Sequence, residues 1–111
     1  MKIFISYTLR DAFLSIEYLQ YFENVFSKLG DPYIDILHNK DPYPQEHVMR
    51  VLKQSEVFYA LITPRYFESS WVQLELNIAI QRHIPIIAVV LNQRTNMSMQ
   101  RTVMLNFEQV A

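Results

Sequence analysis

The sequence predicts an α/β fold, an open parallel sheet of four to five strands with helices on both faces. Short runs of β-type residues alternate with longer stretches in which apolar residues recur every three or four positions. The run Pro85–Leu91 is apolar at nearly every position, as a strand covered on both faces must be. With 111 residues the chain is expected to form a single domain, 1–111. A domain of this size can bury roughly two thirds of its surface.

The N-terminal third predicts a strand followed by a long helix. Lys2–Tyr7 is a short β-rich run, and Asp11 is suited to cap the helix that follows. Gly30 and Pro32 are expected to end this helix. Its apolar residues step by three or four positions: Leu14, Tyr18, Phe22, Val25 and Leu29.

The middle of the chain predicts a second strand–helix unit. Tyr33–Leu37 is the expected second strand, and His38–Pro44 is a loop punctuated by two prolines. A helix is expected over residues 45–54, and Glu56–Ile62 is the third strand. Because connections between parallel strands are crossovers, these units should lie side by side in one sheet.

The next helix begins with the pattern of a capping box. Ser70 is the predicted N-cap and Gln73 the residue that reaches back to it, and the helix continues to about His83. The fourth strand is Pro85–Leu91.

The tail, residues 92–111, is shortened or atypical for such a fold. Val103, Met104, Phe107 and Val110 suit one face of a helix, whereas Thr102–Phe107 is compatible with an edge strand. We favour the helix.

Composition excludes several kinds of site. A formal net charge of −1 without a basic block argues against nucleic-acid binding, and the absence of cysteine excludes thiolate metal sites and fits the cytoplasm. The only glycine, Gly30, cannot build a dinucleotide or phosphate loop. His38, His47 and His83 lack metal-ligand spacing, and the longest apolar run, Ile84–Leu91, is too short to cross a membrane.

Ligands of open parallel sheets bind beyond the carboxyl ends of the strands. That edge should gather Tyr7–Arg10, His38–Pro44 and Thr63–Ser70. The aromatic residues in and after the third strand are interpreted as core and loop packing: Phe58, Tyr59, Tyr66 and Phe67.

Glu75 is the most informative position in the last predicted helix, because helical spacing places it among apolar residues. Isolated burial of a charge is prohibitive, so this carboxylate must be paired, or lie at a crevice or an interface. Trp71 is four residues earlier, which brings an indole beside the carboxylate. An ion pair with Arg65 or Arg82 is the alternative interpretation.

Two segments resemble the Toll/interleukin-1 receptor (TIR) domain family. Phe4-Ile5-Ser6-Tyr7, followed by Asp11, is similar to the first sequence box of the family. The segment Ser55–Leu76 (SEVFYALITPRYFESSWVQLEL) is similar to its third strand, loop and following helix, including a Ser-x-Trp-x-x-x-Glu arrangement. The resemblance covers residues 1 to about 91 in the expected order.

The resemblance implies a flavodoxin-like sheet and one of two functions. Some TIR domains signal by self-association, and others cleave NAD at the nicotinamide glycosidic bond, sometimes cyclising the product. In enzymatic members the acid of the Trp-x-x-x-Glu motif is catalytic, which corresponds to Glu75 here. The predicted substrate-binding residues are Ser6, Tyr7, Asp35, His38, Ser70 and Trp71.

The chain also departs from the family pattern. Its loop His38–Pro44 contains no glycine, and Thr8 stands where several enzymatic members have a basic residue. The early end of the chain predicts that the fifth strand of the family is missing or reduced.

We therefore expect an NAD glycohydrolase or ADP-ribose cyclase in defence or immune signalling, with NAD as substrate and no cofactor or metal. Expected partners are further copies of the chain or other TIR domains, with no nucleic acid and no membrane. One alternative is a noncatalytic TIR–TIR adaptor that docks through His38–Pro44. Another is an enzyme resembling nucleoside deoxyribosyltransferases, which also use a lone glutamate.

Overall fold

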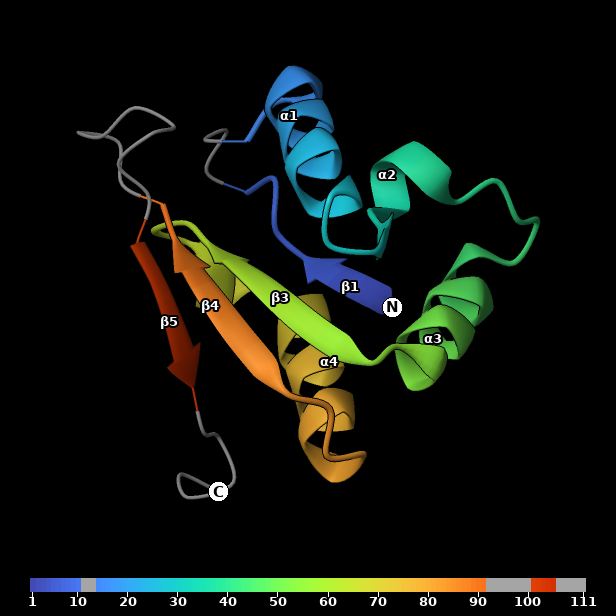
Figure 1. Ribbon diagram of the computed structural model, residues 1–111. Coiled ribbons are helices and arrows are strands. Elements are labelled where there is room, and N and C mark those ends of the chain that lie inside the picture. The colour runs from blue at the N-terminus through green and yellow to red at the C-terminus, as the bar shows by residue number, and fades with distance from the viewer. Residues whose placement is uncertain (11–13, 92–100, 106–111) are drawn as a thin grey trace.

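The computed structural model describes residues 1–10, 14–91 and 101–105, which form one five-stranded sheet in the order β2-β1-β3-β4-β5 (Figure 1). The first four strands are mutually parallel, and β5 is antiparallel to β4. The predicted open parallel sheet is therefore confirmed, with an antiparallel strand added at one edge. The strands are β1 (Lys2–Ser6), β2 (Asp31–Tyr33), β3 (Val57–Ile62), β4 (Ile86–Val90) and β5 (Arg101–Leu105).

Helices cover both faces of this sheet, with α1 on one side and α4 on the other (Figure 1). Successive side chains of a strand point to opposite faces, so β1 contributes to two apolar cores. Ile3 and Ile5 pack in the core beneath α1, and Phe4 packs in the core beneath α3 and α4. The helices are α1 (Ile16–Ser27), α2 (Asp35–His38), α3 (Pro44–Gln54), the 3₁₀ turn η1 (Tyr66–Glu68) and α4 (Ser70–Gln81).

Helix α1 begins later than its sequence pattern suggests. Ser15 is the N-cap, and its hydroxyl accepts a hydrogen bond from the Tyr18 amide at 3.1 Å. The prediction that Asp11 caps this helix is therefore wrong, and Asp11 itself lies outside the described residues. A serine hydroxyl serves the unpaired amides of the first turn as well as a carboxylate does, so either residue could have been the cap.

The second strand lies earlier in the sequence than predicted. β2 covers Asp31–Tyr33, and most of the predicted strand Tyr33–Leu37 belongs to the short helix α2. The amides of Leu37 and His38 both donate to the carbonyl of Ile34, which is fully buried. A buried apolar residue followed by one helical turn has the composition of a strand, which explains the error.

The cap of α4 is Ser69 rather than Ser70. The Ser69 hydroxyl accepts from the Val72 amide at 3.3 Å, while Ser70 is the exposed first residue of the helix. The Gln73 side chain donates to the Phe67 carbonyl at 2.7 Å instead of returning to the cap. The predicted capping box is thus wrong by one residue at its start.

The C-terminal end of α4 closes in an unusual way. His83 adopts a positive φ of 56°, and the Ile84 amide donates to the Ala79 carbonyl at 2.9 Å. This left-handed closure normally uses glycine, which the chain does not have at that position.

The predicted helix in the tail is also wrong where the structure describes it. Residues 101–105 form β5, paired with β4 from Val90↔Arg101 to Ile86↔Leu105. The fifth strand is therefore present, in antiparallel orientation, while 92–100 and 106–111 lie outside the described residues. The backbone groups along the open edge of β4 favour a strand here, and a sequence pattern alone does not report that edge.

Gly30→Ala tests the close approach between Gly30 and the backbone of Met1, where β2 begins to pair with β1. A Cβ at this position would lie 2.4 Å from the carbonyl oxygen of Met1, which accepts the Asp31 amide and aligns β2 with β1. We expect the variant to lose about 1–3 kcal/mol of unfolding free energy in urea denaturation, because backbone must move to relieve the clash. Lys28→Ala, at an exposed position, is the control, and equal stability of the two variants would contradict this account.

Candidate active site

A cavity of about 280 Å³ lies at the carboxyl end of β1, where the first turns of α2 and α4 approach it. The segment after β1 forms one wall, Asp35 of α2 a second, and Trp71 with Glu75 of α4 a third. The complete lining is Ile5, Tyr7, Thr8, Leu9, Asp35, Trp71 and Glu75. Four residues predicted for the site therefore come together from three separate segments: Tyr7, Asp35, Trp71 and Glu75.

Glu75 is the buried acid of this cavity, with 5% of its surface exposed. It lies in the second turn of α4, on the same side as the buried residues Val72 and Ala79. One carboxylate oxygen, Oε1, accepts a hydrogen bond from Ser6 Oγ at 2.9 Å. The Trp71 indole, one turn earlier, lines the cavity with Glu75 and helps to lower the pKa of this carboxyl group. Glu75 is thus held by the Ser6 hydroxyl beside an indole.

No lysine, arginine or histidine in the described ranges forms a salt bridge with Glu75. Arg65 instead pairs with Glu68 at 3.1 Å, and Arg82 is an exposed residue at the C-cap of α4. The ion-pair interpretation offered by the sequence therefore does not describe Glu75. No cation therefore offsets the burial of this carboxyl group in the described part of the chain, and its hydrogen bonds do so only in part.

This environment raises the pKa of Glu75 from 4.5 to about 8. Desolvation by burial is the largest cause, and the negative charge of Asp35 adds to it. The hydrogen bonds from Ser6 and Trp71 act in the opposite direction, because they stabilise the ionised form. Near neutral pH, Glu75 can therefore exist in either protonation state.

Tyr7 and Asp35 are fixed by the same short helix. The Tyr7 hydroxyl accepts the amide of Ile36 at 2.9 Å, which ties the end of β1 to the first turn of α2. Asp35 Oδ1 accepts from Tyr33 Oη at 2.7 Å and from Asn39 Nδ2 at 2.8 Å. Burial raises the pKa of Tyr7 to about 12, although the Ile36 hydrogen bond lowers it, so Tyr7 stays a neutral phenol.

Ser6 and Tyr66 stand behind the cavity rather than in its lining. Ser6 is the last residue of β1 and is 1% exposed, and its hydroxyl accepts from Tyr66 Oη at 2.8 Å. From its sequence context alone, Tyr66 is expected only to pack in the core or the loop. The residue type alone indicates a further role, because a tyrosine within an apolar core needs a hydrogen-bond partner for its hydroxyl.

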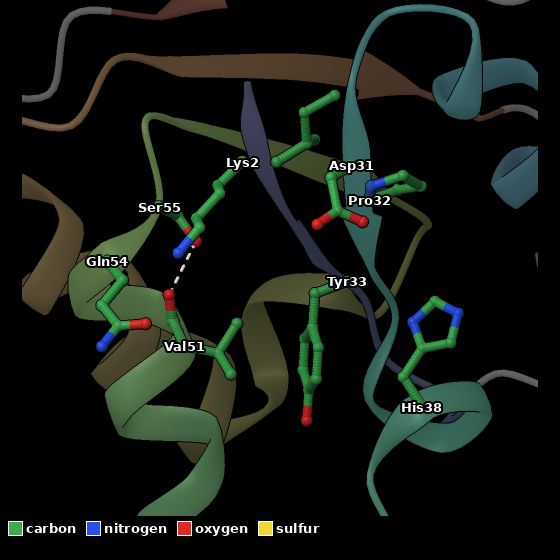
Figure 2. Close-up of a pocket in the computed structure, with 9 residues that line it drawn as sticks. Lys2, Asp31, Pro32, Tyr33, His38, Val51, Gln54 and Ser55 are labelled. Carbon is green, nitrogen blue, oxygen red and sulfur yellow. Dashed lines mark hydrogen bonds between the residues drawn. The ribbon is translucent and has the colours of Figure 1, made fainter.

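His38 and Ser70 do not join the other predicted residues. His38 lines a second pocket of about 320 Å³, together with Tyr33 and residues of α3 (Figure 2). Its Nδ1 accepts the Ile34 amide at 2.9 Å, and its Nε2 pairs with Glu23 of α1. Ser70 is exposed at the start of α4 and is absent from the cavity lining.

The described part of the chain shows neither a metal-binding cluster nor a membrane-spanning helix. No group of three potential metal ligands among His, Asp and Glu is placed to hold an ion there. None of the helices seen in those residues has the length and apolar character needed to cross a membrane.

Glu75→Gln tests the electrostatic cost of this acid. Because the folded protein binds a proton at Glu75 that the unfolded chain releases near pH 4.5, stability falls as pH rises toward 8. Between pH 5 and pH 8 the wild type should lose roughly 3 kcal/mol more unfolding free energy than the neutral isostere. Urea denaturation at several pH values measures this difference, and parallel pH dependences would contradict the raised pKa. Glu46→Gln, an exposed acid of α3, is the control.

Comparison with known proteins gives the family. The TIR domain family model matches residues 3–110, whereas no curated protein and no solved structure shows a significant match. TIR domains are signalling or defence modules and commonly interact with other TIR domains. With nearly the whole chain matched, and with an α/β sheet of the expected kind, this protein belongs to the TIR domain family.

Proposed function

We propose that this TIR domain cleaves NAD at the nicotinamide glycosidic bond, with Glu75 as the catalytic carboxylate. The observation that supports the proposal is a buried acid that faces a cavity beside Trp71 and is held by the Ser6 hydroxyl rather than by a cation. Buried acids with strongly perturbed pKa values in a cleft are characteristic of functional sites. The proposed setting is the cytoplasm, in defence or immune signalling.

The proposed reaction requires few catalytic groups from the protein. Breaking the bond between the ribose carbon and the pyridinium nitrogen sends the electron pair to nitrogen, so nicotinamide leaves as a neutral molecule without a general acid. The ribosyl centre gains oxocarbenium character, which a nearby carboxylate stabilises. Water then attacks the ribose carbon and releases a proton, giving ADP-ribose. Attack by a nucleophile within the same molecule would give a cyclic product.

The other lining residues suit the remaining groups of this substrate. Trp71 and Tyr7 offer aromatic surface for the nicotinamide ring, and Asp35 offers a carboxylate for ribose hydroxyls. A cavity of about 280 Å³ is at the lower limit of small-molecule sites, so it would hold only the nicotinamide riboside end of the dinucleotide. The adenosine end would lie outside it, where a second copy of the domain can contribute contacts.

Nicotinamide release from NAD by concentrated, purified protein tests the proposal. We expect Glu75→Ala and Glu75→Gln each to lower the rate at least about 100-fold, because both remove the charge that stabilises the ribosyl cation. Glu46→Gln should retain the wild-type rate. Equal release by wild type and both Glu75 variants would end the proposal.

The pH dependence of nicotinamide release tests whether the ionised or the neutral form of Glu75 is active. Because the reaction needs the carboxylate, kcat/KM should rise with pH and level off above about 8, where the carboxyl group of the free enzyme ionises. A rate that falls across this range would contradict a carboxylate mechanism.

A noncatalytic assembly module is the second candidate, and Tyr43 is the observation that favours it. Its side chain is 68% exposed, and it lies between Pro42 and Pro44 at the start of α3. Flanking prolines restrict the backbone, which reduces the entropy lost when such a side chain docks on a partner.

Tyr43→Ser tests this role without touching the cavity. We expect the variant to stay monomeric at concentrations where the wild type associates, with an association constant about tenfold lower. Light scattering across a concentration series measures the change, and Tyr21→Ser, on the exposed side of α1, is the matched control. Unchanged association of Tyr43→Ser would exclude docking through this loop.

A further inference from the structure

Three buried polar side chains from three different elements form one hydrogen-bonded chain. Tyr66 of η1 is 0% exposed, Ser6 of β1 is 1% exposed and Glu75 of α4 is 5% exposed. Tyr66 Oη lies 2.8 Å from Ser6 Oγ, which lies 2.9 Å from Glu75 Oε1. Ser6 is therefore the middle member of a connected polar path between the core and the cavity.

When Glu75 is ionised, the hydroxyl protons of Tyr66 and Ser6 must both point along the hydrogen bonds toward Glu75. A carboxylate has no proton to donate, so the single proton of Ser6 must point to Glu75. Ser6 Oγ then accepts the single proton of Tyr66. Each donor thus strengthens the next, because a hydroxyl that accepts a hydrogen bond becomes a better donor.

Tyr66 is well suited to be the fixed end of the chain. Its ring lies in the apolar core with Val72 and Leu76 of α4, and its amide donates to the Thr63 carbonyl at 3.1 Å. Burial raises the pKa of Tyr66, so its phenol remains a donor at any pH at which the domain would be assayed. Packing therefore fixes both the position and the protonation state of this hydroxyl.

We propose that Tyr66 is a positioning residue that acts through the Ser6 hydroxyl to orient the Glu75 carboxylate toward the cavity. The hydrogen bond from Ser6 engages Oε1 of Glu75, and Oε2 takes no part in this hydrogen-bonded series. The catalytic consequence rests on the proposed NAD-cleaving function, whereas the effect on Glu75 itself does not. Without Tyr66, Ser6 is free to rotate its proton away from Glu75.

Four further side chains of the described residues act on Glu75. Asp35 of α2 raises its pKa, and Trp71 of α4 lowers it through a hydrogen bond. Tyr7 after β1 and Tyr33 of β2 also interact electrostatically with Glu75, and burial keeps both phenols neutral. Asp35 is therefore the charged side chain among these neighbours of Glu75.

The test is a carbon-13 NMR titration of the Glu75 side-chain carboxyl in four proteins: wild type, Tyr66→Phe, Ser6→Ala and the double variant. Loss of the direct hydrogen bond in Ser6→Ala should raise the pKa of Glu75 by about 1. Tyr66→Phe should raise it by about 0.3, the share expected from cooperative strengthening. In the double variant the pKa should equal that of Ser6→Ala, because Tyr66 acts only through Ser6.

Two results would overturn the proposal: an unchanged pKa in Tyr66→Phe, or a Tyr66→Phe effect that persists without Ser6. Tyr59→Phe, the same chemical change on the opposite face of the sheet, should leave the Glu75 pKa unchanged. Should Ser6→Ala fail to fold, Tyr66→Phe against Tyr59→Phe still decides the matter. The titration needs no NAD, so its result tests the role of Tyr66 even if the protein does not release nicotinamide. If nicotinamide is released, the pH profile of kcat/KM for Tyr66→Phe should shift upward by the same amount, about 0.3 pH units. Below pH 8 this shift corresponds to about a twofold loss of rate.

Discussion

The hydrogen bond between Ser6 and Glu75 is the interaction on which the candidate site depends. It joins the end of strand β1 to helix α4, across 69 positions of sequence, and both of its side chains are buried. A carboxyl group in such a place costs stability, as the raised pKa of Glu75 records. An apolar residue there would avoid this cost, so packing alone does not explain an acid at this position.

The parallel sheet could be predicted because its central strands are buried on both faces and its helices on one. Those two burial patterns leave different periods in the sequence, as β4 and α1 show. The errors occur where burial does not distinguish the alternatives. Ile34 is fully buried although it lies between a strand and a helix, and β5 owes its conformation to the free edge of β4.

The candidate site could likewise be predicted only in part from the sequence. Trp71 and Glu75 could be paired from helical spacing alone, since both lie on one helix. Parallel-sheet topology predicts Tyr7 at the same edge, whereas Asp35 was expected there only from the resemblance to the TIR family. Tyr66 could not be placed, because the partner of its hydroxyl lies 60 positions away and no local pattern reports it. His38 lies outside the cavity lining, because it ends the helical turn α2 instead of beginning a loop, and its Nδ1 accepts the Ile34 amide.

The antiparallel direction of β5 determines where the chain leaves the sheet. Leu105 pairs with Ile86, at the start of β4, and Lys2 is the first residue of β1 (Figure 1). Both lie at the amino ends of the parallel strands, whereas Tyr7 and Trp71 lie at the opposite edge. A label on the exposed Lys2 side chain would thus lie at the edge of the sheet away from the cavity.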